Sequence, residues 1–160
     1  MEKNSENIKL DEKDRLILRE LARDAGQTRK KLARALNLPL TTVHNRITRL
    51  QRLGVIRGYV ARLDHAKMGK PLAAYVNIKV DYQQLKFGQH ETLKHIAGFE
   101  GVDEATIVTG ETDMVIKVHV SDSNELDDFL TKKLRTVPGV DRTVCWVILH
   151  EPNRMERAVL

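Results

Sequence analysis

The 160-residue chain has a single cysteine, few aromatic residues and no long apolar run. One cysteine, Cys145, excludes a disulfide framework and a cysteine-rich zinc site. Aromatic residues make up only 4% of the chain, so we expect an aliphatic core. The longest apolar run, 144–149, is far too short to span a membrane, and the first ten residues lack the apolar stretch of a signal peptide. These absences predict a cytoplasmic globular protein with no membrane partner, in which Cys145 is a buried small side chain.

Acidic residues are missing from one long stretch. No aspartate or glutamate occurs between Ala25 and Leu63, whereas nine lysines and arginines do. Residues 1–70 carry 17 basic and 8 acidic side chains and residues 71–150 carry 8 and 12, so the net charge of +5 arises in the first half. A one-signed stretch in a folded segment indicates a polyanionic partner. The alternatives are a surface that serves solubility and, less well supported, an acidic membrane, for which the segment lacks a long amphipathic helix with exposed aromatics.

The first half shows the spacing of three short helices. The first follows Asp11 and the second opens at Thr28, because both are preferred N-cap residues at the start of a helical pattern. The third covers residues 40–53, and Pro39 separates it from the second by a turn. A strand is expected at 55–63, where apolar and polar residues alternate.

The second half changes to the two-residue period of strands, with helical segments between them. Their order is β-α-β-β-α-β, the split βαβ arrangement. We therefore predict an α+β protein with a three-helix domain over 1–62, a hinge over 63–71, a ferredoxin-like βαββαβ domain over 72–150, and a tail over 151–160. Two helices can cover only one face of such a sheet, so the other face needs a partner. That face is expected to carry Tyr75, Ala105, Ile107, Val115, Val144, Trp146 and Ile148.

The third helix has the side chains of a DNA-recognition helix. Its apolar residues Val43, Ile47 and Leu50 mark the inner face, and the opposite face carries groups that hydrogen-bond to base edges. An asparagine side chain can form two hydrogen bonds with adenine, and an arginine side chain can form two with guanine. The predicted base contacts are Thr41, Thr42, His44, Asn45 and Arg49, and the predicted phosphate contacts are Arg29, Lys30, Lys31, Arg34, Arg46 and Arg52.

Two blocks of sequence resemble one known family. The runs LDEKDRLILRELARDAG and KKLARALNLPLTTVHNRITRLQRLGVIRGYVARLD are similar to the N-terminal half of the Lrp/AsnC family, the leucine-responsive or feast/famine transcription regulators. The segments IVTGETDMVIKVHV and LRTVPGVDRTVCWVIL resemble its regulatory domain. The resemblance implies a dimeric or octameric regulator that binds double-stranded DNA and often responds to an amino acid. In this interpretation residues 1–62 are the DNA-binding helix-turn-helix domain and residues 72–150 are the dimerisation and effector domain. The chain departs from the family pattern at Pro39, where a serine cap is usual and Thr41 is the expected substitute, at Lys31, usually glutamate, and at Thr112, usually aromatic.

The resemblance and the residues both direct attention to the turn at 109–113. Gly110 lets the chain turn tightly, so that backbone N–H groups can approach an α-carboxylate, and the Asp113 carboxylate could accept hydrogen bonds from an α-ammonium group. A plain hairpin turn is the alternative. The predicted effector residues are Thr109, Gly110, Glu111, Thr112 and Asp113, and the predicted dimer interface is Tyr75, Val144, Trp146 and Ile148. Such a dimer would set two recognition helices about 34–36 Å apart on a pseudo-palindromic operator.

Two other classes of function compete with this interpretation. An enzyme is one, since the split βαβ fold also hosts catalysts. However, no two of the six histidines have the i, i+4 spacing of a helical zinc site, no nucleotide-binding glycine motif occurs, and a Cys145–His119 nucleophile and base would require a reactive thiol in mid-strand. We therefore expect no catalytic residue, metal or cofactor. A metabolite-sensing module without DNA binding is the other class, and the intact basic helix argues against it.

Overall fold

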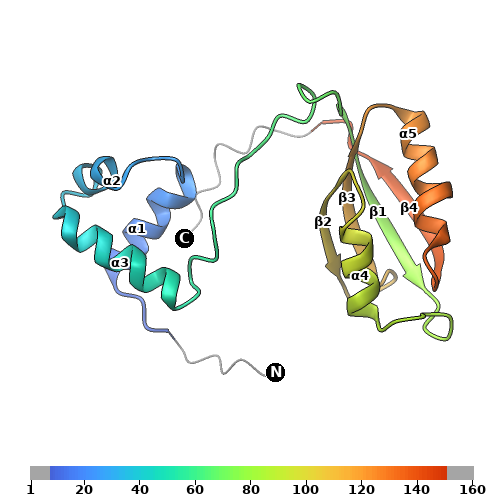
Figure 1. Cartoon of the computed structure of the whole chain (residues 1–160), viewed down its shortest axis with the longest axis horizontal. Helices are drawn as coiled ribbons and strands as arrows, with labels where there is room; N and C mark the ends of the chain where they lie inside the picture. The colour runs from blue at the N-terminus through green and yellow to red at the C-terminus, as the bar shows by residue number, and fades with distance from the viewer. Residues whose placement is uncertain (1–7, 151–160) are drawn as a thin grey trace. The chain divides into compact units, whose positions relative to one another are not determined.

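The computed structural model describes residues 8–150 in two compact units, with the boundary between Arg62 and Leu63. The first unit is helical, and the second contains a four-stranded antiparallel sheet with helices (Figure 1). No described helix is long and apolar enough to cross a membrane. The tail predicted over 151–160 lies outside the described residues.

The first unit contains α1 (Glu12–Arg23), α2 (Arg29–Ala35) and α3 (Leu40–Arg52). Both predicted N-caps are confirmed. The Asp11 side chain accepts from the Asp14 N–H at 2.8 Å, and Asp14 accepts in return from the Asp11 N–H at 3.3 Å, which completes a capping box. Thr28 Oγ1 accepts from the Lys31 N–H at 3.2 Å. The expected capping of α3 by Thr41 is wrong, because α3 begins directly after Pro39 and has no side-chain cap.

The core of the first unit is the predicted apolar stripe. Val43, Ile47 and Leu50 on α3 are at most 2% exposed, and they pack with Ile17 of α1 and Leu32 of α2. Each such side chain contributes about 1.5–3 kcal/mol by leaving water. This packing fixes which side of α3 faces outward and so positions the predicted recognition surface.

The strand predicted at 55–63 is not formed. The Val55 and Ile56 N–H groups donate back to the Leu50 carbonyl at 3.0 and 3.2 Å, after which the chain runs without regular structure to Leu63. Val60 is 91% exposed. Alternation of side chains favours an extended backbone, but a strand also needs a neighbour for its N–H and C=O groups. No strand in the described part of the chain pairs with this segment.

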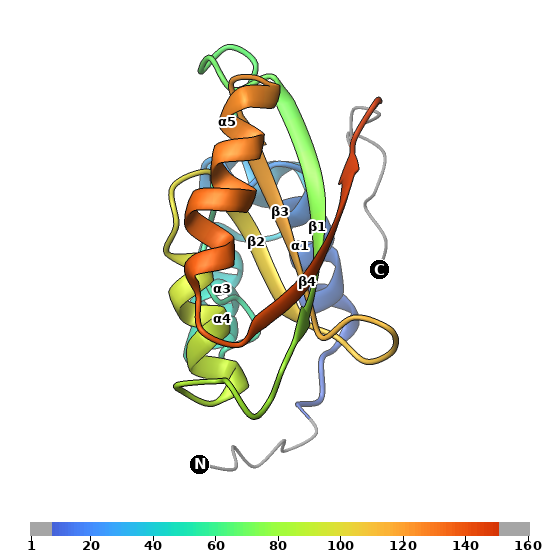
Figure 2. The same ribbon diagram turned by 90° about the vertical axis from the view of Figure 1, so that its right-hand side faces the viewer.

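The second unit has the predicted βαββαβ order. Its strands are β1 (Leu72–Val80), β2 (Val102–Ile107), β3 (Met114–Val120) and β4 (Val140–Val147), arranged β2-β3-β1-β4. The helices α4 (Gln89–Ala97) and α5 (Ser123–Asp128) lie on the same side of the sheet (Figure 2). A π-helical turn, Phe129–Lys133, and a 3-10 turn, Leu134–Thr136, continue α5. The helices therefore cover one face of the sheet and leave the other open, as predicted.

Two residues expected on the open face lie on the covered face instead. Ala105 pairs with Ile116 and Ile107 pairs with Met114, and both of these β3 partners are fully buried against the helices. The cause is a bulge in β2. Val102 pairs with Val118 and Glu104 pairs with Lys117, so Asp103 between them has no partner in β3. This extra residue shifts the alternation of side chains between the two faces of the sheet for every residue of β2 beyond it.

Candidate DNA-binding and effector sites

The outer face of α3 presents most of the predicted base contacts to solvent. Thr41, His44, Asn45 and Arg49 are exposed, and Thr42 is half-buried. Thr42, Asn45 and Arg49 line one open hollow of about 450 Å³. The other residues that line it are Lys9, Asp11, Asp14 and Arg46.

A buried carboxylate that sequence reasoning missed holds two of the predicted DNA contacts. Asp14 on α1 is 1% exposed, and its oxygens lie 2.8 Å from Arg46 Nη1 and 3.1 Å from Arg49 Nη1. Arg46 Nη1 also lies 2.6 Å from Asp11 Oδ2. Hydrogen bonds to Asp11 and Asp14 raise the pKa of Arg46, and the Asp14 N–H, followed by the Arg46 side chain, lowers the pKa of Asp11. These ion pairs join α1 to α3 and fix both guanidinium groups against the recognition face.

The predicted phosphate contacts differ in how free they are. The basic side chains of α2 and Arg52 at the end of α3 are exposed, whereas the Arg46 side chain is only 25% exposed because its acidic partners cover it. The Arg29 guanidinium contacts Nδ1 of the His44 ring, which ties the start of α2 to α3. Lys31 Nζ lies 3.5 Å from the Asp24 carboxylate. Both side chains are exposed, and such surface ion pairs contribute little to the free energy of folding. The exposed members are Arg29, Lys30, Lys31, Arg34 and Arg52.

The turn before β3 has an outward and an inward part. Thr109, Gly110 and Glu111 are exposed, and Gly110 has φ +123°, a backbone region that favours glycine. Thr112 points inward, where its hydroxyl oxygen lies 2.9 Å from the Ile78 carbonyl and 3.2 Å from that of Met114. Thr112 therefore anchors the turn to β1 and β3, while the tip of the turn, residues 109–111, stays accessible to solvent.

The Asp113 carboxylate is engaged by the chain's own donors. Its Oδ2 accepts from the Val80 N–H at 3.0 Å, its Oδ1 accepts from the Tyr82 hydroxyl at 2.9 Å, and Lys79 Nζ lies 3.3 and 3.1 Å from the two oxygens. Burial opposes ionisation, but the donors of Val80, Lys79 and Tyr82 outweigh it and lower the pKa of Asp113. Three hydrogen bonds therefore hold most of the roughly four acceptor positions of this carboxylate, so Asp113 is poorly placed to accept from an α-ammonium group.

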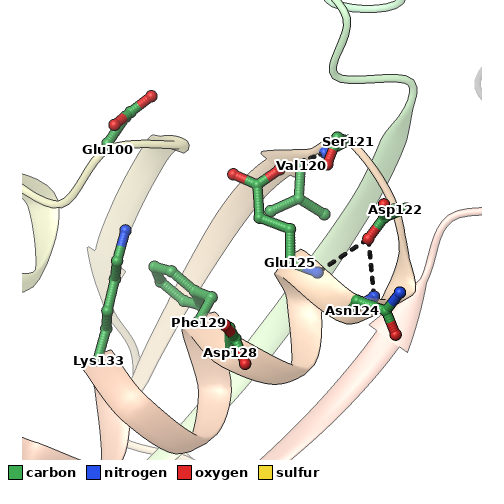
Figure 3. A pocket seen from close by; sticks show the side chains of 9 residues that line it. All are labelled: Glu100, Val120, Ser121, Asp122, Asn124, Glu125, Asp128, Phe129 and Lys133. Carbon is green, nitrogen blue, oxygen red and sulfur yellow. Dashed lines mark hydrogen bonds between the residues drawn. The ribbon is translucent and has the colours of Figure 1, made fainter.

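A second cavity lies at the other end of β3, where Ser121 and Asp122 follow the strand (Figure 3). It has a volume of about 340 Å³. Asp122 caps α5 by accepting from the N–H groups of Asn124 and Glu125, and Glu125 accepts from the Ser121 N–H at 2.6 Å, which lowers the pKa of Glu125. These carboxylates hold the local backbone, and the cavity is separate from the 109–113 turn.

The open face of the sheet brings together the predicted interface residues. Tyr75 pairs with Trp146 across β1 and β4, and Trp146 is 61% exposed. Val144, two residues before Trp146, is 40% exposed on the same face. Ile148 lies just beyond β4, where its N–H donates to the Ala73 carbonyl at 2.8 Å. Cys145 packs against the covered face, and burial raises the pKa of its thiol, which does not suit a nucleophile.

One cluster of possible metal ligands was missed by sequence reasoning. His65, Asp103 and His119 meet in the second unit, with their ligand atoms within 4.8 Å of one another. The search of the sequence for a helical i, i+4 pair could not find them, because they come from a turn, a bulge and a strand.

Comparison with known families assigns both units. Residues 10–57 match a family model described as winged helix-turn-helix DNA-binding, and residues 73–157 match one described as the Lrp/AsnC ligand binding domain. An HTH-type transcriptional regulator of Pyrococcus horikoshii is 33% identical over 140 residues, which cover 88% of this chain and 86% of the relative.

Solved structures agree with this assignment. The leucine response regulatory protein of Mycobacterium tuberculosis is 34% identical, with a TM-score of 0.74, and the match covers 92% of this chain and 98% of that one. A transcriptional regulator of Neisseria meningitidis, solved in complex with L-Met, has a TM-score of 0.79 over 90% of this chain and 92% of its own. At 23% identity, that likeness concerns the fold alone.

Proposed function

The chain belongs to the Lrp/AsnC family of helix-turn-helix transcription regulators, which are not enzymes, and from this premise we propose how its own residues bind DNA and an effector. The single observation that carries the proposal is the outer face of α3, which is polar, basic and exposed opposite a fully buried apolar stripe. Because a regulator of this kind acts on chromosomal DNA, we place the protein in the cytoplasm.

In this proposal α3 enters the major groove and reads bases. Asn45 pairs with adenine and Arg49 with guanine, and Thr41, Thr42 and His44 complete the contact near the start of the helix. The N-terminus of α3 has no side-chain cap, so its N–H groups suit a DNA phosphate. Arg29, Lys30, Lys31, Arg34 and Arg52 supply further phosphate contacts, whereas Arg46 serves mainly to hold α3 on α1, since Asp11 and Asp14 occupy it.

Operator binding measured against salt and sequence tests this proposal. Asn45→Ala is expected to cost about 1–3 kcal/mol and to relax base preference, whereas Lys30→Ala is expected to weaken binding to all sequences alike. Gln51→Ala, on an exposed α3 position outside the predicted set, is the matched control. If a dimer neutralises six to ten phosphates, log K falls with log salt at a slope of roughly −5 to −9. A salt-independent affinity would refute the proposal.

We further propose that two chains form a homodimer through the open sheet face around Tyr75, Val144, Trp146 and Ile148. The exposed Trp146 beside Val144 supports this, because an apolar face of a sheet is unfavourable in water. Trp146→Asp should produce monomers in sedimentation and abolish tight operator binding. Phe87→Asp, at an equally exposed aromatic outside the face, should leave the dimer intact. Dimers that survive Trp146→Asp would rule out this face; sedimentation also separates a dimer from an octamer.

For the effector we propose a free amino acid at the exposed tip of the turn. The family model describes a ligand binding domain and a relative at 34% identity is named for leucine response, which supports this class of ligand. The accessible carboxylate there is Glu111, which is better placed than Asp113 to accept from an α-ammonium group, while Thr109 and Gly110 offer backbone groups to the α-carboxylate. Thr112 and Asp113 hold the turn in shape.

Calorimetric titration with the twenty amino acids tests the effector site. Glu111→Gln should abolish or strongly weaken binding, and Glu91→Gln, on an exposed α4 position, should not change it. Absence of binding to the wild type, or full binding by Glu111→Gln, would show that the turn is a plain hairpin.

A further inference from the structure

Three side chains of the second unit meet at a place that neither DNA binding nor the effector turn uses. Asp103 Oδ2 lies 3.1 Å from His65 Nε2 and 2.8 Å from His119 Nδ1. The two imidazole rings are stacked, with their centroids 3.8 Å apart and an interplanar angle of 5°. Two imidazoles that converge on one carboxylate oxygen form a compact set of nitrogen and oxygen donors.

The backbone around Asp103 is built to bring it to His119. The His119 N–H donates to the Gly101 carbonyl at 2.8 Å, and a Cβ at residue 101 would lie 2.9 Å from the His119 carbonyl oxygen. Gly101 also has φ +90°. The chain can therefore approach this closely only with glycine, and the bulge that follows leaves Asp103 unpaired in the sheet and turns its side chain toward His119.

His65 is held in the same region by two further contacts. Its carbonyl accepts from the Met68 and Lys70 N–H groups at 3.1 and 2.8 Å, which closes the turn that contains it. Lys70 Nζ then lies 2.9 Å from Glu100 Oε1, immediately before Gly101. The turn is thus fastened to the segment that leads into β2, which keeps His65 beside His119. Because the two rings are stacked and nearly parallel, at least one of them rotates when both lone pairs point at a common ion.

His119 is buried and its Nδ1 is unsatisfied. The side chain is 9% exposed, and although Nδ1 is close to Asp103 it makes no hydrogen bond of acceptable geometry. Burial lowers the pKa of His119, with smaller contributions from the charges of His65 and Lys117, and Asp103 opposes them. The buried Nδ1 therefore faces Asp103 without a hydrogen-bond partner, which is the arrangement expected of a nitrogen that can serve as a metal ligand.

We propose that His65 Nε2, Asp103 Oδ2 and His119 Nδ1 bind a zinc ion. Zinc takes imidazole nitrogen and carboxylate oxygen at about 2.0–2.2 Å, and around a tetrahedral ion such ligands lie roughly 3–3.5 Å apart, close to the contacts of Asp103. Two nitrogen donors disfavour calcium and magnesium. Three protein ligands leave the fourth position to water. Lys117 is the nearby cation that opposes binding, and the exposed Glu104 is its partner in the strand register.

The site has a consequence for the protein's architecture. His65 belongs to the segment that connects the helical unit to β1, whereas Asp103 and His119 belong to the sheet. A bound ion would cross-link the connecting segment to β2 and β3, so zinc would restrict its motion. This inference goes beyond the proposed regulator and does not depend on DNA or an amino acid.

Zinc binding to the full-length chain tests the inference directly. Metal-free protein is titrated with Zn²⁺ against a chromophoric chelator, and Co²⁺ is used as a spectroscopic probe of coordination. We expect one ion per chain and a cobalt spectrum of low coordination number. His65→Gln, Asp103→Asn and His119→Gln should each weaken zinc affinity at least tenfold. His90→Gln, on an exposed α4 position, should leave it unchanged.

A second readout separates ligand loss from misfolding. Circular dichroism identifies any variant that fails to fold, and His65→Gln is the safest substitution because the residue lies in a turn outside the sheet. Zinc should raise the melting temperature of the wild type and of His90→Gln but not of folded His65→Gln. Absence of zinc binding at micromolar metal, or equal affinity in His65→Gln and the wild type, would overturn the inference while leaving the DNA-binding proposal untouched.

Discussion

Replacement of Asp14 by asparagine tests the ion cluster between α1 and α3. Asp14 is 1% exposed and accepts from Arg46 and Arg49, whose side chains are 25% and 43% exposed. Breaking a fully buried ion pair costs about 3–5 kcal/mol, because an uncompensated charge remains. In Asp14→Asn the charges left without their partner belong to Arg46 and Arg49, whose guanidinium groups reach water. Arg46 still forms its ion pair with Asp11, and the asparagine side chain still offers one acceptor oxygen. We therefore expect a loss of roughly 2 kcal/mol in the free energy of unfolding, near the value of one hydrogen bond to a charged group.

The assay uses the two units separately. Urea unfolding followed by far-UV circular dichroism reports the helices, most of which belong to the first unit, whereas fluorescence reports the single tryptophan, Trp146, in the second. Asp14→Asn should shift the dichroism transition to lower urea and leave the Trp146 transition unchanged. Asp128→Asn is the control, because Asp128 pairs with Lys132 at 2.6 Å but is 54% exposed, and it should cost less than about 1 kcal/mol.

Asp14→Asn is also expected to change DNA affinity and its dependence on salt. Removing one negative charge beside Arg46 and Arg49 should increase non-specific affinity and steepen the dependence of log K on log salt by up to about 0.9 for each chain, if the freed charge meets a phosphate. Base preference should fall, because the guanidinium groups are no longer fixed. Equal stability losses in Asp14→Asn and Asp128→Asn, together with an unchanged salt slope, would refute the assigned role of Asp14.

Three other substitutions probe the second unit. Gly101→Ala should destabilise it by about 1–3 kcal/mol in urea unfolding, because φ is +90° and the new Cβ meets a backbone carbonyl; a neutral result would show that the strands can separate there. Asp113→Asn should remove stability at pH 7, and the loss should shrink as the pH falls below the unfolded pKa of 3.8. The pKa of Asp113 is lower in the folded state, so the stability it contributes is lost as the pH falls through the folded value. Ile116→Ala, at a fully buried β3 position, should cost about 2–5 kcal/mol, and a much smaller loss in thermal melting would indicate that the core collapses around the gap.

Sequence reasoning succeeded where the signal is local. The N-caps at Asp11 and Thr28 precede helical patterns by one residue, and the stripe Val43, Ile47, Leu50 is visible at its own spacing. The order of strands and helices follows from the change of period after Pro71. These features need no knowledge of distant parts of the chain.

It failed where a long-range partner decides the structure. The bulge at Asp103 reverses the faces of Ala105 and Ile107, and only the pairing with β3 reveals it. Residues 55–63 have the alternation of a strand but no neighbour in the described chain. Asp14 lies 32 and 35 residues from its two arginines, so sequence spacing could not indicate their meeting.

The two predicted sites differ in whether their key side chain can leave its internal partner. If a guanine recruits Arg49, Asp14 keeps its hydrogen bond to Arg46, so the buried carboxylate stays compensated. Arg49 is also 43% exposed, and it reaches solvent without moving α3. Asp113 has less reserve, because three hydrogen bonds from the chain hold its two oxygens, and releasing the one from Val80 would leave a buried N–H unpaired at the end of β1. Recruitment of Arg49 by DNA is therefore expected to cost little, whereas recruitment of Asp113 by a ligand would weaken the attachment of the turn to β1, which is why we propose Glu111 for the effector contact.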